Sequence, residues 1–420
     1  MSANLLVHSA KQLLTLASPH GPRRGPAMNE LSLINDGAVA VQGDRIVLVG
    51  PTPEVLAHAG EDTTLVDASG KVVIPGFVDP HTHLVFAGDR AEEFEMRLQG
   101  ATYLEIMSAG GGIMNTVRAT RTASLEDLMI QSRQRLDRML AHGTTTAEAK
   151  TGYGLDTENE LKMLEAIRLL HQGHPVDIIP TFLGAHAIPA EYQGRNEEYA
   201  NLVIDEMLPR VEREGLGKQE GPFFCDVFCE EGAFSLEQSK RILEKALEMG
   251  MGLKIHADEF TSLGGAALAA ELKATSADHL ACTPEEEIKL LVDSGTIAVL
   301  LPGTPFGLGE AHYPLARRMI ELGVPVALAT DLNPGTCYCE AMPFIMALAC
   351  RKMGMTPAET IVAATINAAH AIDMGHEVGS LEVGKKADLL ILDIPDYRHL
   401  VYRFGTNLVE TTVKAGRVIE

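Results

Sequence analysis

The chain has 420 residues, of which 46% are hydrophobic and 22% are charged, the composition of a globular protein large enough for one big domain and a smaller one. Its formal net charge of −22 argues against nucleic acid and anionic membranes as partners, because both require a basic face, and a small-molecule partner is expected instead. No run approaches the roughly 18 apolar residues that a membrane helix requires, and the first residues lack the basic and apolar regions of a signal peptide.

The cysteines indicate a location in the cell. There are six, at positions 225, 229, 282, 337, 339 and 350, and their spacing is no disulfide framework for a chain of this length. Free thiols and a cytoplasmic location are therefore expected. The isolated Cys337-Tyr338-Cys339 motif has no second cysteine pair, so packing is favoured over metal binding.

The two ends of the chain are rich in short strands and turns. In residues 1–73, the segment GAVAVQGDRIVLVGP alternates in hydrophobicity and breaks at a turn, Gly43-Asp44. Residues 376–420 have the same character, with turns at Gly384-Lys385 and Ala415-Gly416. These two segments are expected to pair into one small β domain.

Residues 74–375 alternate between apolar runs of strand length and helices. The eight runs are VIPGFVDPHTH, TTTAEAK, DIIPTFLGAH, FFCDVFCEEG, GLKIHADEF, TSADHLA, TIAVLLPG and PVALATD. Capping boxes predict helix starts at Ser124, Thr157, Ser235 and Thr283. Continuous apolar strands alternating with helices predict a parallel sheet, and eight of them over about 260 residues predict a (β/α)8 TIM-like barrel. A doubly wound open sheet is the alternative, but it would need a glycine turn after the first strand.

Titratable side chains end seven of the eight runs. They are His81 and His83, Lys150, His186, Glu230 and Glu231, His256 with Glu259, His279, and Asp331. Chemistry in such barrels takes place at the C-terminal ends of the strands, so these side chains are expected to converge on one rim. Two imidazoles two residues apart on one strand also face the same side, which provides half of a metal site.

Longer motifs point to a known family. The segments PGFVDPHTH, KIHADE and ATDLNPGT resemble the amidohydrolase superfamily. The segments FAGDRAEEFEMRLQGATYLEIMSAGGGIMNTVRATR, EAKTGYGL, PTFLGAHAIPAEY and SADHL resemble its imidazolonepropionase family, from about Leu31 to the C-terminus. The resemblance implies a barrel with a small β-sandwich built from both termini. It also implies hydrolytic opening of the 4-imidazolone-5-propanoate ring to N-formimidoyl-L-glutamate in histidine degradation.

The residue types are consistent with that chemistry. One divalent ion bound by His81, His83, His256 and Asp331 would have three nitrogen ligands and one oxygen ligand, a set that suits zinc or iron. Such an ion lowers the pKa of water and polarises a carbonyl. The resemblance implies that Glu259 and His279 are catalytic and that Asp331 is both a ligand and a possible proton acceptor.

Two strand-end residues have alternative roles. Lys150 is carboxylated and bridges two metals in some amidohydrolases, but its Thr-Gly-Tyr-Gly context favours an unmodified lysine with a structural role. His186 could bind a second ion, whereas the resemblance implies that it binds substrate.

The implied substrate carries a propionate group, which needs a positive partner in this acidic chain. Arg90 could hold that carboxylate with two hydrogen bonds, which lysine does less well. The remaining substrate-binding residues implied by the resemblance are Tyr103, Tyr153, His186, Glu259, Asn333, Gly335 and Thr336.

Two other functions are weighed against this one. Another cyclic-amide hydrolase or deaminase of the superfamily, dihydroorotase-like or guanine-deaminase-like, would have a binuclear site or a purine pocket. A catalytically silent barrel acting as an interaction protein would lose metal ligands, and here all four are present. The resemblance further implies a homodimer.

Overall fold

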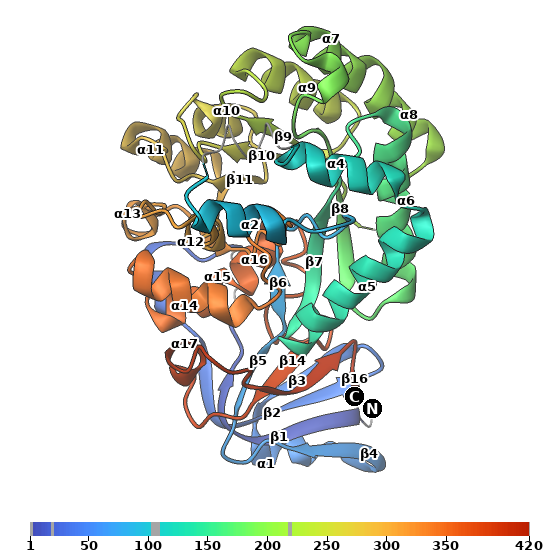
Figure 1. The fold of residues 1–420 in the computed structure, drawn as a ribbon. Coiled ribbons are helices and arrows are strands. Elements are labelled where there is room, and N and C mark those ends of the chain that lie inside the picture. The colour runs from blue at the N-terminus through green and yellow to red at the C-terminus, as the bar shows by residue number, and fades with distance from the viewer. Residues whose placement is uncertain (1–2, 18–20, 102–109, 217–220, 420) are drawn as a thin grey trace.

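A computed structural model shows two sheets stacked along the long axis of the molecule, one above the other (Figure 1). It describes residues 3–17, 21–101, 110–216 and 221–419. The sheet nearer the termini has eight strands, in the order β16-β15-β14-β5-β1-β2-β3, with β4 paired to β1. The other sheet has eight strands in the order β13-β12-β11-β10-β9-β8-β7-β6.

The first sheet draws strands from both ends of the chain, as the sequence predicted. Its strands are β1 (Ala3–Leu14), β2 (Leu33–Gln42), β3 (Arg45–Pro51), β4 (Ala59–Asp67), β5 (Val72–Pro75), β14 (Leu389–Leu392), β15 (Val409–Lys414) and β16 (Arg417–Ile419). The predicted turns Gly43-Asp44 and Ala415-Gly416 connect β2 to β3 and β15 to β16, and both Gly43 and Gly416 have positive φ. The contact between the two ends of the chain is the antiparallel pair β5–β14, in which Ile74 faces Leu390.

The second sheet contains the eight predicted parallel strands. They are β6 (Phe77–Asp79), β7 (Thr144–Lys150), β8 (Asp177–Ala185), β9 (Phe224–Cys229), β10 (Gly252–Ala257), β11 (Ser276–His279), β12 (Ile297–Leu300) and β13 (Val326–Leu328). Beyond the strands, the Asp331 amide donates to the His81 carbonyl, and the His83 amide donates to the Leu332 carbonyl. These bonds join the first strand to the last, so the sheet curves into a nearly closed barrel.

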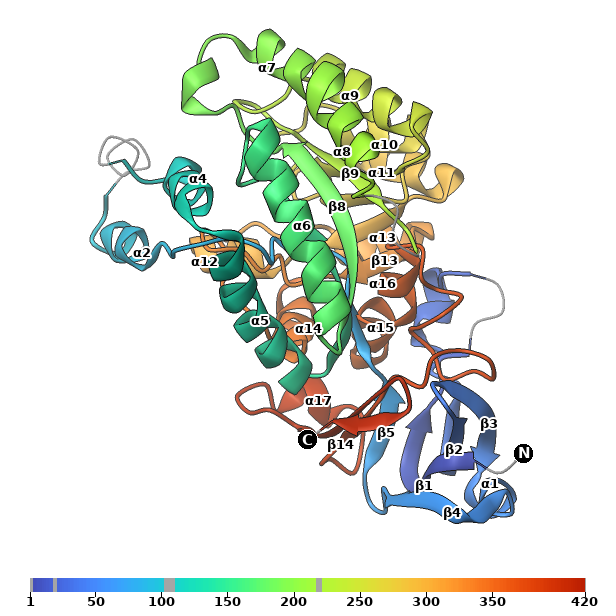
Figure 2. The same cartoon turned by 90° about the vertical axis from the view of Figure 1, so that its right-hand side faces the viewer.

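Helices cover the outside of the barrel (Figure 2). They are α5 (Leu125–Ala141), α6 (Thr157–Gly173), α8 (Leu208–Glu214), α9 (Leu236–Glu248), α10 (Gly265–Glu271), α11 (Glu285–Ser294), α13 (Ala316–Leu322), α14 (Met342–Lys352), α15 (Pro357–Ala363) and α16 (Ile366–His370). The other helices are α1 (Thr52–Leu56), α2 (Ala91–Leu98), α4 (Ile113–Thr122), α7 (Asn196–Leu202), α12 (Gly303–Leu308) and α17 (His399–Tyr402). Single helical turns lie at Gly25–Asn29 and Ala190–Tyr192, and a π-helical turn lies at Val203–Met207.

The predicted helix starts were accurate to within two residues. Capping boxes at Ser124 and Ser235 are present, with reciprocal hydrogen bonds. The cap of α6 is Asp156 instead of Thr157, because the Asp156 carboxylate accepts from the Asn159 amide. Helix α11 begins after Pro284, one residue beyond the predicted cap. Helices α5, α6 and α9 bury their apolar faces in one continuous core with the barrel strands, whereas α1 packs on the terminal sheet.

Candidate active site

The segment after β6 places two imidazoles side by side at the rim of the barrel. His81 and His83 are both buried, and their ring centroids lie 5.5 Å apart. Because residues i and i+2 of an extended chain point to the same side, Thr82 points away from both rings. Its hydroxyl instead donates to the Glu148 carbonyl on the neighbouring strand.

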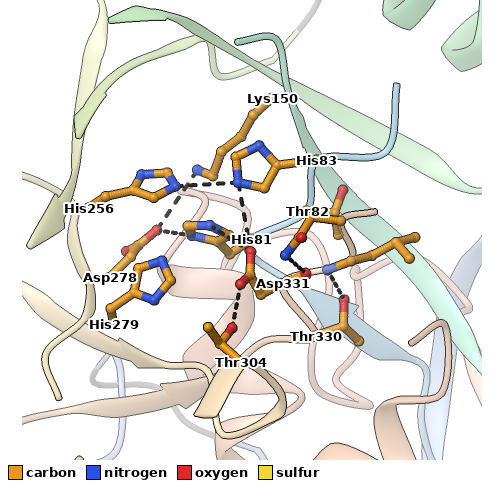
Figure 3. Close-up of polar contacts among 12 residues, drawn as sticks. His81, Thr82, His83, Lys150, His256, Asp278, His279, Thr304, Thr330 and Asp331 are labelled. Carbon is orange, nitrogen blue, oxygen red and sulfur yellow. Dashed lines mark hydrogen bonds and ion pairs between the residues drawn. The ribbon is translucent and has the colours of Figure 1, made fainter. Parts of the chain in front are cut away.

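Two distant strands bring the remaining predicted ligands to the same place (Figure 3). His256 lies at the end of β10, with its Nε2 atom 3.4 Å from Nε2 of His83. The Oδ1 atom of Asp331 lies 3.5 Å from Nε2 of His81 and 3.7 Å from Nε2 of His83. The Thr304 hydroxyl donates to the other oxygen of that carboxylate. The four predicted ligands therefore converge on one point.

These donor atoms fit a divalent metal ion. Ligand atoms about 2.1 Å from an ion in a tetrahedral arrangement are about 3.4 Å from one another, close to the three distances observed. The His81 Nε2 atom is buried and makes no hydrogen bond within the part of the chain that the structure describes. A buried ring nitrogen that has no partner and faces a carboxylate oxygen and a second imidazole can bind a cation. His279 and His186 belong to overlapping groups of possible ligands.

The next two strand ends add a carboxyl and an imidazole. His279 Nδ1 lies 3.7 Å from Glu259 Oε1; the His279 side chain is buried, and that of Glu259 is 12% exposed. Glu230 holds the Glu259 loop, because its carboxylate accepts from the amides of Phe260 and Thr261. Glu230 was predicted only as a rim residue, and the structure gives it this bracing contact.

Strained backbone accompanies these side chains. Asp258, His279, Leu280 and Asp331 have φ values of 54°, 78°, 57° and 53°, in the left-handed region that favours glycine. Each such residue costs of order 1–3 kcal/mol and persists only where the surrounding structure enforces it. His279 is the last residue of β11, and the other three lie just beyond β10, β11 or β13, where polar groups reach the rim.

His186 and Tyr153 form an aromatic wall beside His83. The His186 ring stacks on His83 with a centroid separation of 4.7 Å, and Tyr153 lies 5.3 Å from His186. His186 Nδ1 lies 2.9 Å from the Gly152 carbonyl, which can only accept, so Nδ1 carries the proton. Its Nε2 atom is thus an acceptor available to a ligand.

Arg90 lies beside the loop that follows Asp331. Its Nε atom donates to Glu93 at 2.8 Å, and the neighbouring Arg97 donates to the Gly335 carbonyl at 3.1 Å. A cavity of about 500 Å³ opens here, and Arg90, Arg97, Gly335 and Thr336 are among the residues that line it. Two arginines thus lie beside this loop, and Arg97 was not identified by the sequence reasoning.

Asn333 organises this loop. Its Oδ1 atom accepts from the amides of Gly335 and Thr336, each at 2.8 Å, and its Nδ2 atom donates to the Asp331 carbonyl at 2.7 Å. Three predicted substrate-binding residues thus lie in one bonded turn next to the predicted ligand. Tyr103, the remaining predicted contact, lies outside the described residues.

Burial shifts the pKa values of the site in opposite directions for acids and bases. Burial and neighbouring cations lower the pKa values of His81, His83 and His279, so these rings are neutral, as metal ligands and proton acceptors must be. Burial lowers the pKa of His186 to about 3 and raises that of Asp331 to about 6. Burial and the nearby Asp331 raise the pKa of Glu259, which favours the protonated carboxyl.

A second set of charged residues, which the sequence reasoning missed, lies beneath the histidines. Glu148, Asp226, Lys254 and Asp278 are fully buried within strands, around Lys150. Burial lowers the pKa of the Lys150 ammonium, but contacts with Asp226, Glu148 and Asp278 outweigh that effect and raise it overall. The available signal was a charged residue inside an otherwise apolar strand, such as the aspartate in FFCDVFC.

The fold and this site define the class of protein. The model of the amidohydrolase family matches residues 72–419, and the chain belongs to that family of metal-dependent hydrolases. In the described part of the structure, no helix is long and apolar enough to cross a membrane.

Curated relatives narrow the class. The chain is 53% identical to an imidazolonepropionase of Herpetosiphon aurantiacus over 99% of this chain and 97% of that protein. It is 54% identical to one of Symbiobacterium thermophilum and 52% identical to one of Geobacillus kaustophilus, with 99% and 97% coverage in both cases. Within the amidohydrolases, the chain therefore groups with the imidazolonepropionases.

Solved structures with low sequence identity support the fold. An adenosine deaminase from Xanthomonas campestris with bound zinc has a TM-score of 0.72 at 19% identity, covering 99% of this chain and 93% of that one. An E. coli guanine deaminase has a TM-score of 0.75 at 16% identity, covering 99% and 98%. At this identity the likeness concerns the fold alone.

Proposed function

We propose that this chain hydrolyses the ring of 4-imidazolone-5-propanoate to N-formimidoyl-L-glutamate. The observation that carries the proposal is the combination of full-length identity to imidazolonepropionases with a complete donor set at the barrel rim. Arg90, which lies against Gly335 in the loop that follows Asp331, would supply the positive charge that a propionate requires.

One divalent ion per chain, zinc or iron, is proposed to bind to His81, His83, His256 and Asp331. When bound, such an ion polarises the scissile carbonyl and lowers the pKa of water. The mutual distances of the donor atoms support this assignment, and the contacts of Lys150 with three carboxylates support a lysine that is not a metal bridge.

The proton transfers are assigned to three acid–base groups. In the proposed reaction, water adds to the ring carbonyl carbon and the carbon–nitrogen bond breaks, giving a carboxylate and a protonated nitrogen. Asp331, with a pKa of about 6, is ionised at neutral pH and can accept a proton from water. The raised pKa of Glu259 favours its protonated form, which can give a proton to the departing nitrogen, and His279 lies close enough to Glu259 to orient it.

The substrate is proposed to lie between the histidines and Arg90. Tyr153 and His186 would flank the ring, His186 through its free Nε2 atom, and Arg90 would bind the propionate. Tyr103, Asn333, Gly335 and Thr336 complete the proposed contacts. The bonds that Asn333 makes within its own loop support an organising role beside any contact with substrate.

The quaternary state, location and domain division are proposed as well. A homodimer and a cytoplasmic location follow the family resemblance and the free cysteines. Residues 1–73 and 376–420 are proposed as one β domain and residues 74–375 as the barrel. A hydrophobic cluster confined to the terminal strands and the residues next to them supports this division.

The decisive experiment combines metal analysis of the purified protein with an assay for imidazolone loss. Appearance of N-formimidoyl-L-glutamate, followed by NMR, with one equivalent of zinc or iron is expected. Hydrolysis of dihydroorotate or deamination of guanine without imidazolone loss would favour the alternative functions, and two metal equivalents would contradict the one-ion assignment.

A further inference from the structure

A buried layer of charge lies directly beneath the proposed metal ligands. Five residues form it: Glu148 and Lys150 from β7, Asp226 from β9, Lys254 from β10 and Asp278 from β11. All five have zero exposure. Charged side chains are almost never buried this completely unless each one is paired, so the contacts within the layer matter.

Two carboxylates of this layer contact the back of two proposed ligands. Asp278 Oδ2 lies 2.6 Å from Nδ1 of His81, and Asp226 Oδ2 lies 3.0 Å from Nδ1 of His256. The first pair is a hydrogen bond, and the second is an ion-pair contact. Because an ionised carboxylate can only accept, both contacts favour a proton on Nδ1. The Nε2 lone pairs of both rings are then free on the side where Asp331 and His83 lie.

One ammonium group joins the two carboxylates. Lys150 Nζ lies 2.6 Å from Glu148, 2.7 Å from Asp226 and 3.8 Å from Asp278 (Figure 3 shows Lys150 and Asp278). Lys254 Nζ adds a contact to Asp278 at 3.4 Å and donates to the Ser276 hydroxyl at 2.6 Å. The Ser276 hydroxyl in turn donates to the second oxygen of Asp278.

The other oxygen of Asp226 is also fixed. Its Oδ1 atom accepts from the amides of Val227 at 2.7 Å and His256 at 3.1 Å. Asp226 therefore accepts a hydrogen bond from the backbone of His256 and lies in ion-pair contact with its ring. His83 differs, since its Nδ1 atom is buried and, among the residues that the structure describes, no carboxylate contact to that atom is seen.

We propose that Asp226 and Asp278, joined by Lys150, are positioning residues that fix His81 and His256 in the Nδ1–H tautomer before an ion binds. Groups that orient metal-bound imidazoles typically contribute 10- to 100-fold to metal affinity. Glu148, Asp226 and Asp278 together surround the Lys150 ammonium. These contacts keep the amine protonated and unavailable for modification. The inference rests on the proposed metal site and is independent of the identity of the substrate.

The first test uses the unaltered chain without metal. Histidine-selective ¹⁵N labelling and long-range ¹H–¹⁵N NMR report the tautomer of each ring, with histidine variants used to assign the signals. His81 and His256 should carry the proton on Nδ1, whereas His83 has no partner that enforces either tautomer. Nε2–H forms of His81 and His256 would overturn the proposal.

The second test measures affinity for Zn²⁺ by competition with a coloured chelator. Asp226→Ala and Asp278→Ala should each weaken binding by about 10- to 100-fold. Asp226→Asn keeps the size of the side chain but can donate as well as accept, so it should weaken binding and give mixed His256 tautomers. Its use also removes dependence on whether the alanine variants fold.

Asp177→Asn is the matched control. Asp177 is a largely buried carboxylate in contact with two lysines. It is the first residue of β8 and therefore lies at the end of that strand away from the rim. It should lower stability and leave Zn²⁺ affinity unchanged. If Asp226→Asn behaved like this control, with Zn²⁺ affinity within about threefold of the unaltered chain, the positioning role would be refuted.

Discussion

The guanidinium of Arg90 lies directly against the α-carbon of Gly335. A Cβ atom at position 335 would stand 2.1 Å from Nη1 of Arg90, far inside van der Waals contact. Two residues proposed to bind substrate are thus packed together, and the glycine leaves the space that the arginine occupies.

Gly335→Ala is therefore expected to displace Arg90 and raise KM for the propionate substrate. The reason is the overlap alone, since φ at Gly335 is not in the left-handed region. Steady-state kinetics on Gly335→Ala, Arg90→Gln and the double variant check this expectation. In the Arg90→Gln background, Gly335→Ala should raise KM little further. Independent, additive losses would show that Gly335 acts by another route.

Arg90→Gln should raise KM strongly. Loss of a charge-assisted, two-bond contact costs about 1.5–3 kcal/mol, or roughly 10- to 150-fold. Part of the loss will appear in kcat if the remote contact also orients the ring. The control substrate is an analogue that lacks the carboxylate, and on it Arg90→Gln should be as active as the unaltered enzyme. If Arg90→Gln were equally active on the propionate substrate and on the analogue, Arg90 would lie outside the binding site.

Glu259→Gln should lower kcat by about 10²- to 10⁴-fold with metal content unchanged, because general acid–base catalysis contributes that much. Single-turnover kinetics and elemental analysis of the same preparation separate chemistry from metal loss. A near-normal kcat would leave Asp331 or His279 as the proton carrier.

His256→Ala should empty the metal site or greatly weaken binding, since one of four ligands is lost. The fold should survive, because the barrel core is made by the apolar strand interiors. Elemental analysis and far-UV circular dichroism together test this expectation. Retained metal with full activity would remove His256 from the ligand set.

The salt-bridge network between the two sheets predicts a pH dependence of stability. Lys414 of β15 is buried and lies 2.6 Å from both Asp177 and Asp388. Burial raises the pKa of Asp177, but Lys414 and Lys386 outweigh it and lower the pKa overall. The contribution of Asp177 to stability is therefore present above its pKa in the unfolded chain, near 4. It is lost as the pH falls through its lower pKa in the folded protein.

The contribution of Lys414 to stability depends on pH in the opposite direction. Its pKa is raised overall by Asp388 and Asp177 against the effect of burial, so its contribution holds below about pH 10 and is lost at higher pH. Lys414→Met should cost about 3–5 kcal/mol, because buried carboxylates lose their partner. Urea unfolding at several pH values checks this, and an unchanged midpoint at neutral pH would contradict it.

The barrel was predictable because eight mainly apolar runs of strand length alternate with helices along the chain. The prediction of one barrel strand over VIPGFVDPHTH was only partly correct. Residues up to Pro75 pair with β14 in the terminal sheet, and the barrel strand starts at Phe77. The change of sheet occurs at Gly76, where a Cβ would meet the Thr145 side chain at 2.2 Å. Hydrophobicity is the same on both sides of that glycine, so the pattern could not reveal it.

The convergence of the rim residues followed from parallel strands ending on one edge. The charges beneath them did not, because Asp226 and Asp278 have partners on other strands, and a sequence does not show which buried charges will pair. The Asn333 turn was likewise predicted as a set of contacts to substrate, while its internal hydrogen bonds depend on a backbone path known only from the structure.

The pairing of β5 with β14 also constrains the order in which the chain folds during synthesis. One edge of β5 pairs with β1, but the other edge has no partner until residues 389–392 leave the ribosome, after all eight barrel strands have emerged. Contacts so distant in sequence form slowly, and an open strand edge invites pairing with other chains. The sheet that receives the first residues made is therefore the last to be completed, and its unfinished edge is the part of the nascent protein most exposed to aggregation.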